Sequence, residues 1–320
     1  HKISVFLIVS IISMLGYTVY GKLNNSYDFN YRLNENYHSK DAYNEEPKEL
    51  YFAGERVPME KKHVASRIER EVRLLASWKE GTARSLQRAN YWLPIFEEIF
   101  KQYDVPPDFK YLAVIESNLS NVVSPMGAAG FWQLMPQAAA MAKLEINAEV
   151  DERFHPIKAA HAAALVLKNA HGYFNNWTYA CASYNMGVGG MQSAVRANGG
   201  KSYYDMYLNA ETARFIYKLL AVKQIFENPE THGIQVLPTN SYLPPFKSLQ
   251  VKESIPNLLQ FAQKHGLTLA QLKEYNPWLK ANSLTVKPGK SYEILLPTTF
   301  PVWTESMASV SIEPDTLQLP

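Results

Sequence analysis

Apolar residues recur every three or four positions through the central part of the chain. Between about residues 60 and 88 the sequence is highly charged, yet Val64, Ile68, Val72 and Leu75 are spaced four, four and three apart. This spacing places them on one face of a helix. Further helices are predicted at 91–103, 108–115, 136–143, 157–174, 177–185 and 210–226. The pattern predicts an all-helical domain at 89–230, preceded by a linker and helical extension at 22–88.

The pattern changes after Asn228-Pro229, where prolines and β-branched residues become frequent. The segment 246–298 has the pattern of a strand, a helix at 255–265, a second helix at 269–275 and a closing strand that ends at Pro297. Four such elements in about 50 residues are typical of a small α+β module. The predicted fold class is therefore mainly α, with a helical domain, a small α+β module and a tail at 299–320.

An apolar run follows a basic start at residues 1–21. His1 and Lys2 precede a predominantly apolar run of about 14 residues, and polar sequence begins at Lys22. This is typical of a secretory signal peptide. An uncleaved membrane anchor is the alternative, because residues 3–20 are just long enough to span a bilayer. No cysteine follows the run, so a lipoprotein anchor is not expected; on either interpretation the rest of the chain is exported.

Composition narrows the class of partner. Apolar residues make up 47% and charged residues 19% of the 320 residues, as in globular proteins, and the net charge of +2 is too small to predict a nucleic-acid partner. Cys181, the one cysteine, rules out an internal disulfide and a Cys-based zinc site. His155, His161 and His171 lack the spacing of zinc ligands. We therefore expect no metal and no cofactor. A monomer is the expected oligomeric state.

Glu116 is the main candidate for chemistry. It ends the apolar run Ala113-Val-Ile. A carboxyl group partly removed from water there would have a raised pKa, which a general acid for glycoside cleavage needs near neutral pH. Taken alone, such a glutamate is more often an ordinary surface residue.

The stretch after Glu116 favours the catalytic interpretation over the surface one. It is rich in Gly, Ala and Pro up to Gly130, and it then presents Phe131, Trp132 and Gln133. Glycines let a backbone approach a ligand closely, and an aromatic pair beside an amide predicts a platform for a sugar. The alternative is that the glycines form a turn and that Trp132 belongs to the core.

These motifs resemble the goose-lysozyme-like lytic transglycosylases. Two further motifs carry the resemblance, Ser183-Tyr184-Asn185-Met-Gly187 and Glu211-Thr-Ala-Arg214-Phe215. It covers about residues 90–227, and the four motifs in this order and spacing are highly specific. The resemblance implies a lysozyme-like domain, a periplasmic location, peptidoglycan glycan strands as the partner and Glu116 as the catalytic residue. The substrate-binding residues that we predict on this basis are Ser117, Ser124, Gly130, Trp132, Gln133, Tyr184, Asn185 and Phe215.

The family's reaction needs one carboxyl group. It cleaves the β-1,4 bond between N-acetylmuramic acid and N-acetylglucosamine and leaves a 1,6-anhydromuramic end. Ordinary glycosidases use two carboxyl groups, and this chain has no Asp or Glu from Ser117 to Leu144. A goose-type lysozyme hydrolase, with a second carboxylate brought in by folding, is the first alternative.

Two departures motivate a second alternative, a catalytically weak peptidoglycan-binding scaffold. The family usually has tyrosine where Phe215 stands, and that tyrosine helps to orient the acid. Tyr217 would point roughly the opposite way on a helix, so we expect a lower rate with the chemistry retained. The segment 246–298 resembles a LysM domain, but its usual Gly-Asp-Thr turn is replaced by residues 252–256. Glycan binding and a purely packing role both remain open for this module.

Overall fold

The computed structural model describes residues 49–236 and 246–297. The expected signal peptide or anchor, most of the predicted linker and the expected tail lie outside these residues. Within the two ranges, no helix combines the length and the apolar character that crossing a membrane would need.

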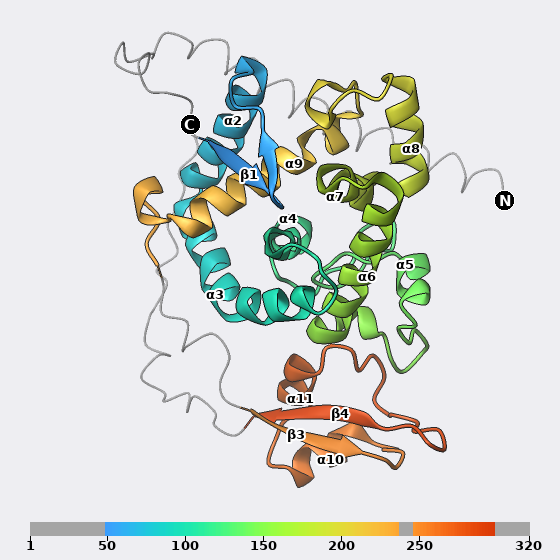
Figure 1. Cartoon of the computed structure of the whole chain (residues 1–320). Helices are drawn as coiled ribbons and strands as arrows, with labels where there is room; N and C mark the ends of the chain where they lie inside the picture. The colour runs from blue at the N-terminus through green and yellow to red at the C-terminus, as the bar shows by residue number, and fades with distance from the viewer. Residues whose placement is uncertain (1–48, 237–245, 298–320) are drawn as a thin grey trace, which may run out of the picture. The chain divides into compact units, whose positions relative to one another are not determined.

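The larger part is a helical domain, as the sequence predicts (Figure 1). Its elements in chain order are β1 (Leu50–Phe52), β2 (Glu55–Val57), α2 (Lys62–Ser77), α3 (Lys79–Lys101), η1 (Pro107–Tyr111), α4 (Leu112–Ser117), α5 (Pro136–Met141), η2 (Glu152–Phe154), α6 (Pro156–Phe174), α7 (Trp177–Met186), α8 (Val188–Ala197), η3 (Tyr203–Asp205), α9 (Ala210–Glu227) and η4 (Glu230–His232).

The short helix α4 lies in the middle of this domain, with α3, α6, α7 and α9 around it (Figure 1). Leu112 and Ala113 at its start have no exposed surface, because they pack in the main hydrophobic core. This core also takes up the alanine-rich face of α6 and the apolar face of α9. The catalytic candidate is thus carried by an element that is packed in the core.

The predicted boundary at residues 88–89 falls inside a continuous helix. Helix α3 runs through it from Lys79, and the break in the charged segment is at Trp78, where φ is −97° and ψ is 56°. Helix α2 packs along α9, and its residues Val64 and Ile68 are buried in the main hydrophobic core. Residues 62–88 therefore pack as part of the helical domain.

A β-hairpin was not predicted in the segment before residue 58. Strands β1 and β2 pair antiparallel, and their turn places Ala53 and Gly54 at φ of 52° and 79°. The carboxylate of Glu55 then accepts hydrogen bonds from the backbone N–H groups of Trp177 and Thr178, at 2.5 and 3.0 Å. An acidic group at a helix N-terminus is favourable, so the hairpin caps α7.

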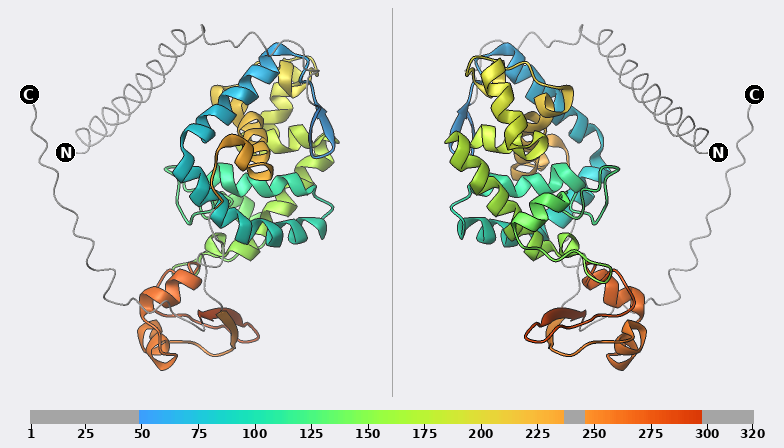
Figure 2. Two further views of the ribbon diagram at one scale, coloured as in Figure 1. Left: turned by 90° about the vertical axis from the view of Figure 1, so that its left-hand side faces the viewer. Right: turned by 90° about the vertical axis from the view of Figure 1, so that its right-hand side faces the viewer.

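The second part is the predicted α+β module (Figures 1 and 2). It consists of β3 (Phe246–Val251), α10 (Leu258–Lys264), α11 (Leu269–Tyr275) and β4 (Tyr292–Pro297). The two strands pair antiparallel, from Phe246 opposite Pro297 to Val251 opposite Tyr292. The side chain of Asn276 is fully buried and exchanges three hydrogen bonds with the backbone of Leu272 and Leu295. This amide fixes α11 against β4.

Candidate active site

Glu116 lies one residue from the end of α4. The helix ends because Asn118 and Leu119 both adopt positive φ angles, of 55° and 54°, which a helix cannot continue through. The chain then enters residues 118–135, which we call the active-site loop. The side chain of Ser117 donates a hydrogen bond to the carbonyl of Phe131 at 2.8 Å, so the end of α4 is tied to the far side of this loop.

The environment of Glu116 keeps its carboxyl group protonated. Burial, the largest cause, and the nearby carboxylate of Glu211 together raise its pKa to about 8, against the opposing effect of Lys218. No lysine, arginine or histidine of the described part of the chain forms an ion pair with Glu116 within 4.0 Å. At pH 7 about nine in ten molecules would therefore carry the acid form. The lysine salt bridge that a non-catalytic scaffold would show is not present among these residues.

Backbone bridges shape the active-site loop. Ala129 pairs with Val123 on one side and with Leu134 on the other. The hydroxyl of Ser124 accepts a hydrogen bond from the backbone of Ala128 at 3.1 Å. The side-chain amide of Gln133 donates to the carbonyls of Val122 and Gly130, at 3.1 and 2.9 Å. Ser124 and the Gln133 amide N–H groups thus hold the loop itself, and their contact with a substrate stays a prediction.

The expected aromatic sugar platform is wrong. Trp132 has no exposed surface and Phe131 only 4%. The Trp132 ring lies 4.9 Å from that of Phe96 and 5.2 Å from that of Phe100, centroid to centroid, because α3 covers this part of the loop. The Trp132 ring packs in the core under the active-site loop, and it presents no face to a sugar.

Gly130 lies against the backbone of Arg153. Its φ is 77°, and a Cβ atom at this position would lie 1.9 Å from the carbonyl oxygen of Arg153. The absent side chain therefore makes room for the protein's own backbone. The expected approach of the Gly130 backbone to a ligand stays a prediction.

Helix α7 brings the third motif to Glu116. Tyr184 donates from its hydroxyl to the carbonyl of Trp132 at 2.7 Å, and both burial and the nearby Glu116 raise the pKa of Tyr184. Asn185 donates to Glu211 at 2.9 Å and accepts from the Thr212 hydroxyl at 2.7 Å. Tyr184 and Asn185 therefore join the active-site loop to the start of α9.

Phe215 and Tyr217, two of the aromatic residues of α9, have separate environments. Phe215 is 4% exposed and belongs to the main core. Tyr217 packs against the rings of Tyr203 and Tyr204, at 6.3 and 6.1 Å, with the Arg67 guanidinium 5.6 Å from its ring. Tyr217 is therefore engaged with η3 and α2, and it does not supply the hydroxyl that Phe215 lacks.

Arg214 has a structural role that the sequence did not reveal. Its guanidinium forms two hydrogen bonds of 2.9 Å with the carboxylate of Glu71, whose side chain is 8% exposed. This bidentate pair joins α9 to α2. Since Glu71 precedes Arg214 by 143 residues, no sequence spacing could have indicated it.

The acidic residues that follow the active-site loop in sequence are engaged elsewhere. Glu145 contacts Lys290 and Tyr292, Glu149 contacts Ser283 and Thr285, and Glu152 contacts Lys158. Glu211 differs from these residues because it is close enough to raise the pKa of Glu116. It is the one candidate among the four for a second carboxylate. Residues 49–236 and 246–297 contain no group of three or more His, Cys, Asp or Glu side chains that could hold a metal ion.

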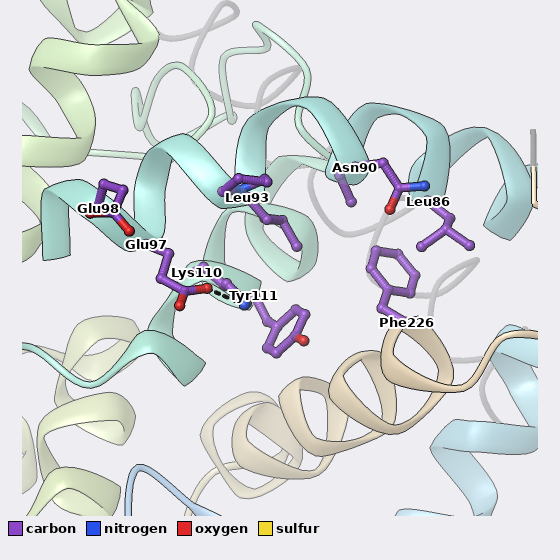
Figure 3. Close-up of a pocket in the computed structure, with 10 residues that line it drawn as sticks. Leu86, Asn90, Leu93, Glu97, Glu98, Lys110, Tyr111 and Phe226 are labelled. Atoms are coloured by element: carbon purple, nitrogen blue, oxygen red, sulfur yellow. Dashed lines mark hydrogen bonds and ion pairs between the residues drawn. The ribbon is translucent and has the colours of Figure 1, made fainter. Parts of the chain in front are cut away.

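A hollow of about 600 Å³ lies apart from these residues, between α3, η1 and the end of α9 (Figure 3). Phe226 and Leu86 face each other across one end of it. At the other end Lys110 binds Glu97 at 2.6 Å. None of the predicted site residues lines this hollow, so it is not part of the candidate active site.

Comparison with known proteins identifies the class of both parts. Residues 94–207 match the family described as "Transglycosylase SLT domain", and residues 247–299 match "Soluble lytic transglycosylase C-terminal LysM-like domain". The chain therefore carries an SLT transglycosylase domain followed by a LysM-like domain, which confirms the resemblance seen in the sequence.

The chain is also similar to individual known proteins. Over 218 residues the chain is 25% identical to membrane-bound lytic murein transglycosylase D of Escherichia coli strain K12, a match that covers 66% of this chain and 48% of the relative. Over 114 residues it is 29% identical to a putative tributyltin chloride resistance protein of Alteromonas sp. strain M-1, covering 35% and 55% of the two chains. The chain thus spans about half the length of the curated relatives it matches. A solved structure of an inactive mutant of lytic transglycosylase Slt from Pseudomonas aeruginosa matches with a TM-score of 0.35 and 19% identity, over 54% of this chain and 31% of that one.

Proposed function

We propose that this protein is a lytic transglycosylase that cleaves peptidoglycan glycan strands, with Glu116 as its single acid and base. The observation that carries the proposal is the half-buried carboxyl group of Glu116 at the end of α4, whose surroundings raise its pKa to about 8, within an SLT transglycosylase domain. A group that is neutral at pH 7 can donate a proton to a glycosidic oxygen, which an ordinary glutamate rarely can.

The proposed reaction uses this carboxyl group twice. Glu116 gives its proton to the oxygen that links N-acetylmuramic acid to N-acetylglucosamine, and the bond from that oxygen to the muramyl C1 breaks. The carboxylate then removes the proton from the muramyl 6-hydroxyl, whose oxygen forms the new bond to C1. The product is a 1,6-anhydro end, no water is consumed, and Glu116 regains its proton.

A goose-type lysozyme hydrolase on the same scaffold is the second candidate. The proximity of Glu211 favours it, because a second carboxylate could activate a water molecule at the muramyl C1. However, Glu211 is held by Asn185 at 2.9 Å, in an exposed position at the first turn of α9. This engagement supports a role in tuning the charge near Glu116, and we therefore favour the single-carboxylate reaction.

Export is part of the proposal. The apolar run at residues 3–20 would direct the chain to the periplasm, where its substrate lies, either as a cleaved signal or as an anchor. The name of the Escherichia coli relative, a membrane-bound enzyme, is in line with this location.

The decisive experiment is digestion of purified peptidoglycan sacculi with mass spectrometry of the released fragments. We expect fragments with 1,6-anhydromuramic ends from the wild-type protein and none from Glu116→Gln. Reducing muramic ends that disappear in Glu211→Gln would establish the hydrolase instead. A wild-type protein that pellets with sacculi but releases neither product would contradict both enzymatic proposals and favour a binding scaffold.

A further inference from the structure

The loop at residues 145–154, which follows α5, docks onto the LysM-like module. Val150 pairs with Leu279 in an antiparallel bridge, with hydrogen bonds from Asp151 to the Trp278 carbonyl at 3.0 Å and from Lys280 to the Glu149 carbonyl at 2.8 Å. The loop thus adds a short strand-like pairing to the module.

The carboxylate of Glu149 reinforces this docking. It accepts hydrogen bonds from the Ser283 hydroxyl at 2.5 Å and from the backbone N–H of Thr285 at 2.8 Å. These contacts hold the pKa of Glu149 below its usual value, the Ser283 bond being the largest cause. Glu149 is therefore an ionised clamp on the segment 283–285.

The same loop holds the active-site loop from its other side through Arg153. The guanidinium forms a bidentate pair with Asp151, at 3.0 and 2.8 Å, and both residues are less than 10% exposed. Its remaining nitrogen donates to the carbonyls of Gly127 and Leu134, at 2.7 and 3.2 Å. These two carbonyls flank the segment that carries Gln133.

Apolar packing makes the same connection. Ala129 of the active-site loop and Val150 and Phe154 of the docking loop share one buried cluster with the module's Leu258 and Trp278. Ala129 has no exposed surface and is the central partner of both backbone bridges in the active-site loop. The module's core thus reaches into the loop that shapes the proposed site.

We propose that Arg153 is a positioning residue through which docking of the LysM-like module fixes the active-site loop beside Glu116. The kinetic consequence of this coupling, a change in kcat, rests on the proposed function. It assigns the module a role in organising the catalytic geometry, whether or not the module also binds glycan. Two of these links, the Glu149 clamp and the Asp151–Arg153 pair, depend on polar side chains and can be altered by single substitutions.

The first test measures kcat and KM separately on a soluble, peptide-free glycan of alternating N-acetylglucosamine and N-acetylmuramic acid. Glu149→Ala loosens the docking without touching the active-site loop, and we expect it to lower kcat about 5- to 20-fold, since small misplacements of reacting groups are costly. Arg153→Lys loses the bidentate fork, and we expect a larger loss, of about 100-fold. Glu293→Ala, which removes an exposed carboxylate from β4 of the same module, should leave kcat unchanged. Wild-type kcat in Glu149→Ala would overturn the proposal, even if Arg153→Lys were impaired.

The second test does not depend on activity. Amide hydrogen exchange at Ala129 and Leu134, which bond to each other's carbonyls at 3.2 and 3.1 Å, reports directly on the order of the active-site loop. We expect at least about tenfold faster exchange at both amides in Glu149→Ala, with unchanged exchange in the core helix α6. Unchanged exchange at both amides would refute the coupling. If the wild-type protein cleaves no glycan but the exchange still responds, the proposed function fails while the coupling stands.

Discussion

Replacing Glu116 by glutamine should stabilise the protein, and by an amount that grows with pH. The carboxyl group has a pKa of about 8 in the folded protein against 4.5 when unperturbed. The folded state therefore prefers the neutral form of this carboxyl group. The wild-type protein has its full free energy of unfolding below about pH 4.5, and the contribution of neutral Glu116 is lost as the pH rises through about 8. Glutamine is neutral at every pH and has nearly the same shape.

The magnitude follows from the two pKa values. Linkage gives a cost of folding with Glu116 of about 1 kcal/mol at pH 5 and about 3 kcal/mol at pH 7. The advantage of Glu116→Gln in the free energy of unfolding should therefore grow by about 2 kcal/mol between these pH values. For a folded unit of this size, that corresponds to a gain in relative Tm of about 4–8 °C.

The assay is urea unfolding of both proteins at pH 5, 6 and 7, followed by circular dichroism. Glu253→Gln, which neutralises an exposed carboxyl group, is the matched control and should show a difference that does not change with pH. An advantage of Glu116→Gln that is equal at pH 5 and pH 7 would refute the raised pKa. The acid role proposed for Glu116 would then lose its physical basis.

Three further predictions test the site and its support. Because Glu116 must be protonated, kcat/KM on soluble glycan should fall as the pH rises above about 8, approaching tenfold per pH unit; a fall that begins near pH 5 would contradict the proposed acid. Arg214→Ala should lower the free energy of unfolding by about 3 kcal/mol in urea titration, because Glu71 is left buried and unpaired, whereas the double variant with Glu71→Gln should recover part of the loss. Gly130→Ala should cost at least about 2 kcal/mol more than Gly127→Ala in thermal unfolding, since both positions have positive φ but only the former would press a Cβ atom against Arg153; equal losses would show that the contact is not tight.

The helices of the domain followed from the sequence because their apolar spacing is a local property. The predicted helix at 157–174 differs by one residue from α6, and the predicted helix at 269–275 coincides with α11. Helix α8 was missed, since its first turn contains Gly189 and Gly190, which are poor helix formers. Glu116 and the motifs around it were also visible, because the order and spacing of four motifs are features of the chain itself.

The tertiary structure decided what those residues face. Trp132 could have been a sugar platform or a core residue, and the choice depended on α3, which places Phe96 and Phe100 over its ring. Likewise, Glu211 and Glu116 are 95 positions apart in the sequence. The packing of α9 on α4 places Glu211 close enough to raise the pKa of Glu116. Periodicity determines which side of a helix is buried, but it carries no information about the partner surface. That partner is set by contacts between residues far apart in the chain, and these contacts also determine how strongly a carboxyl group is removed from water.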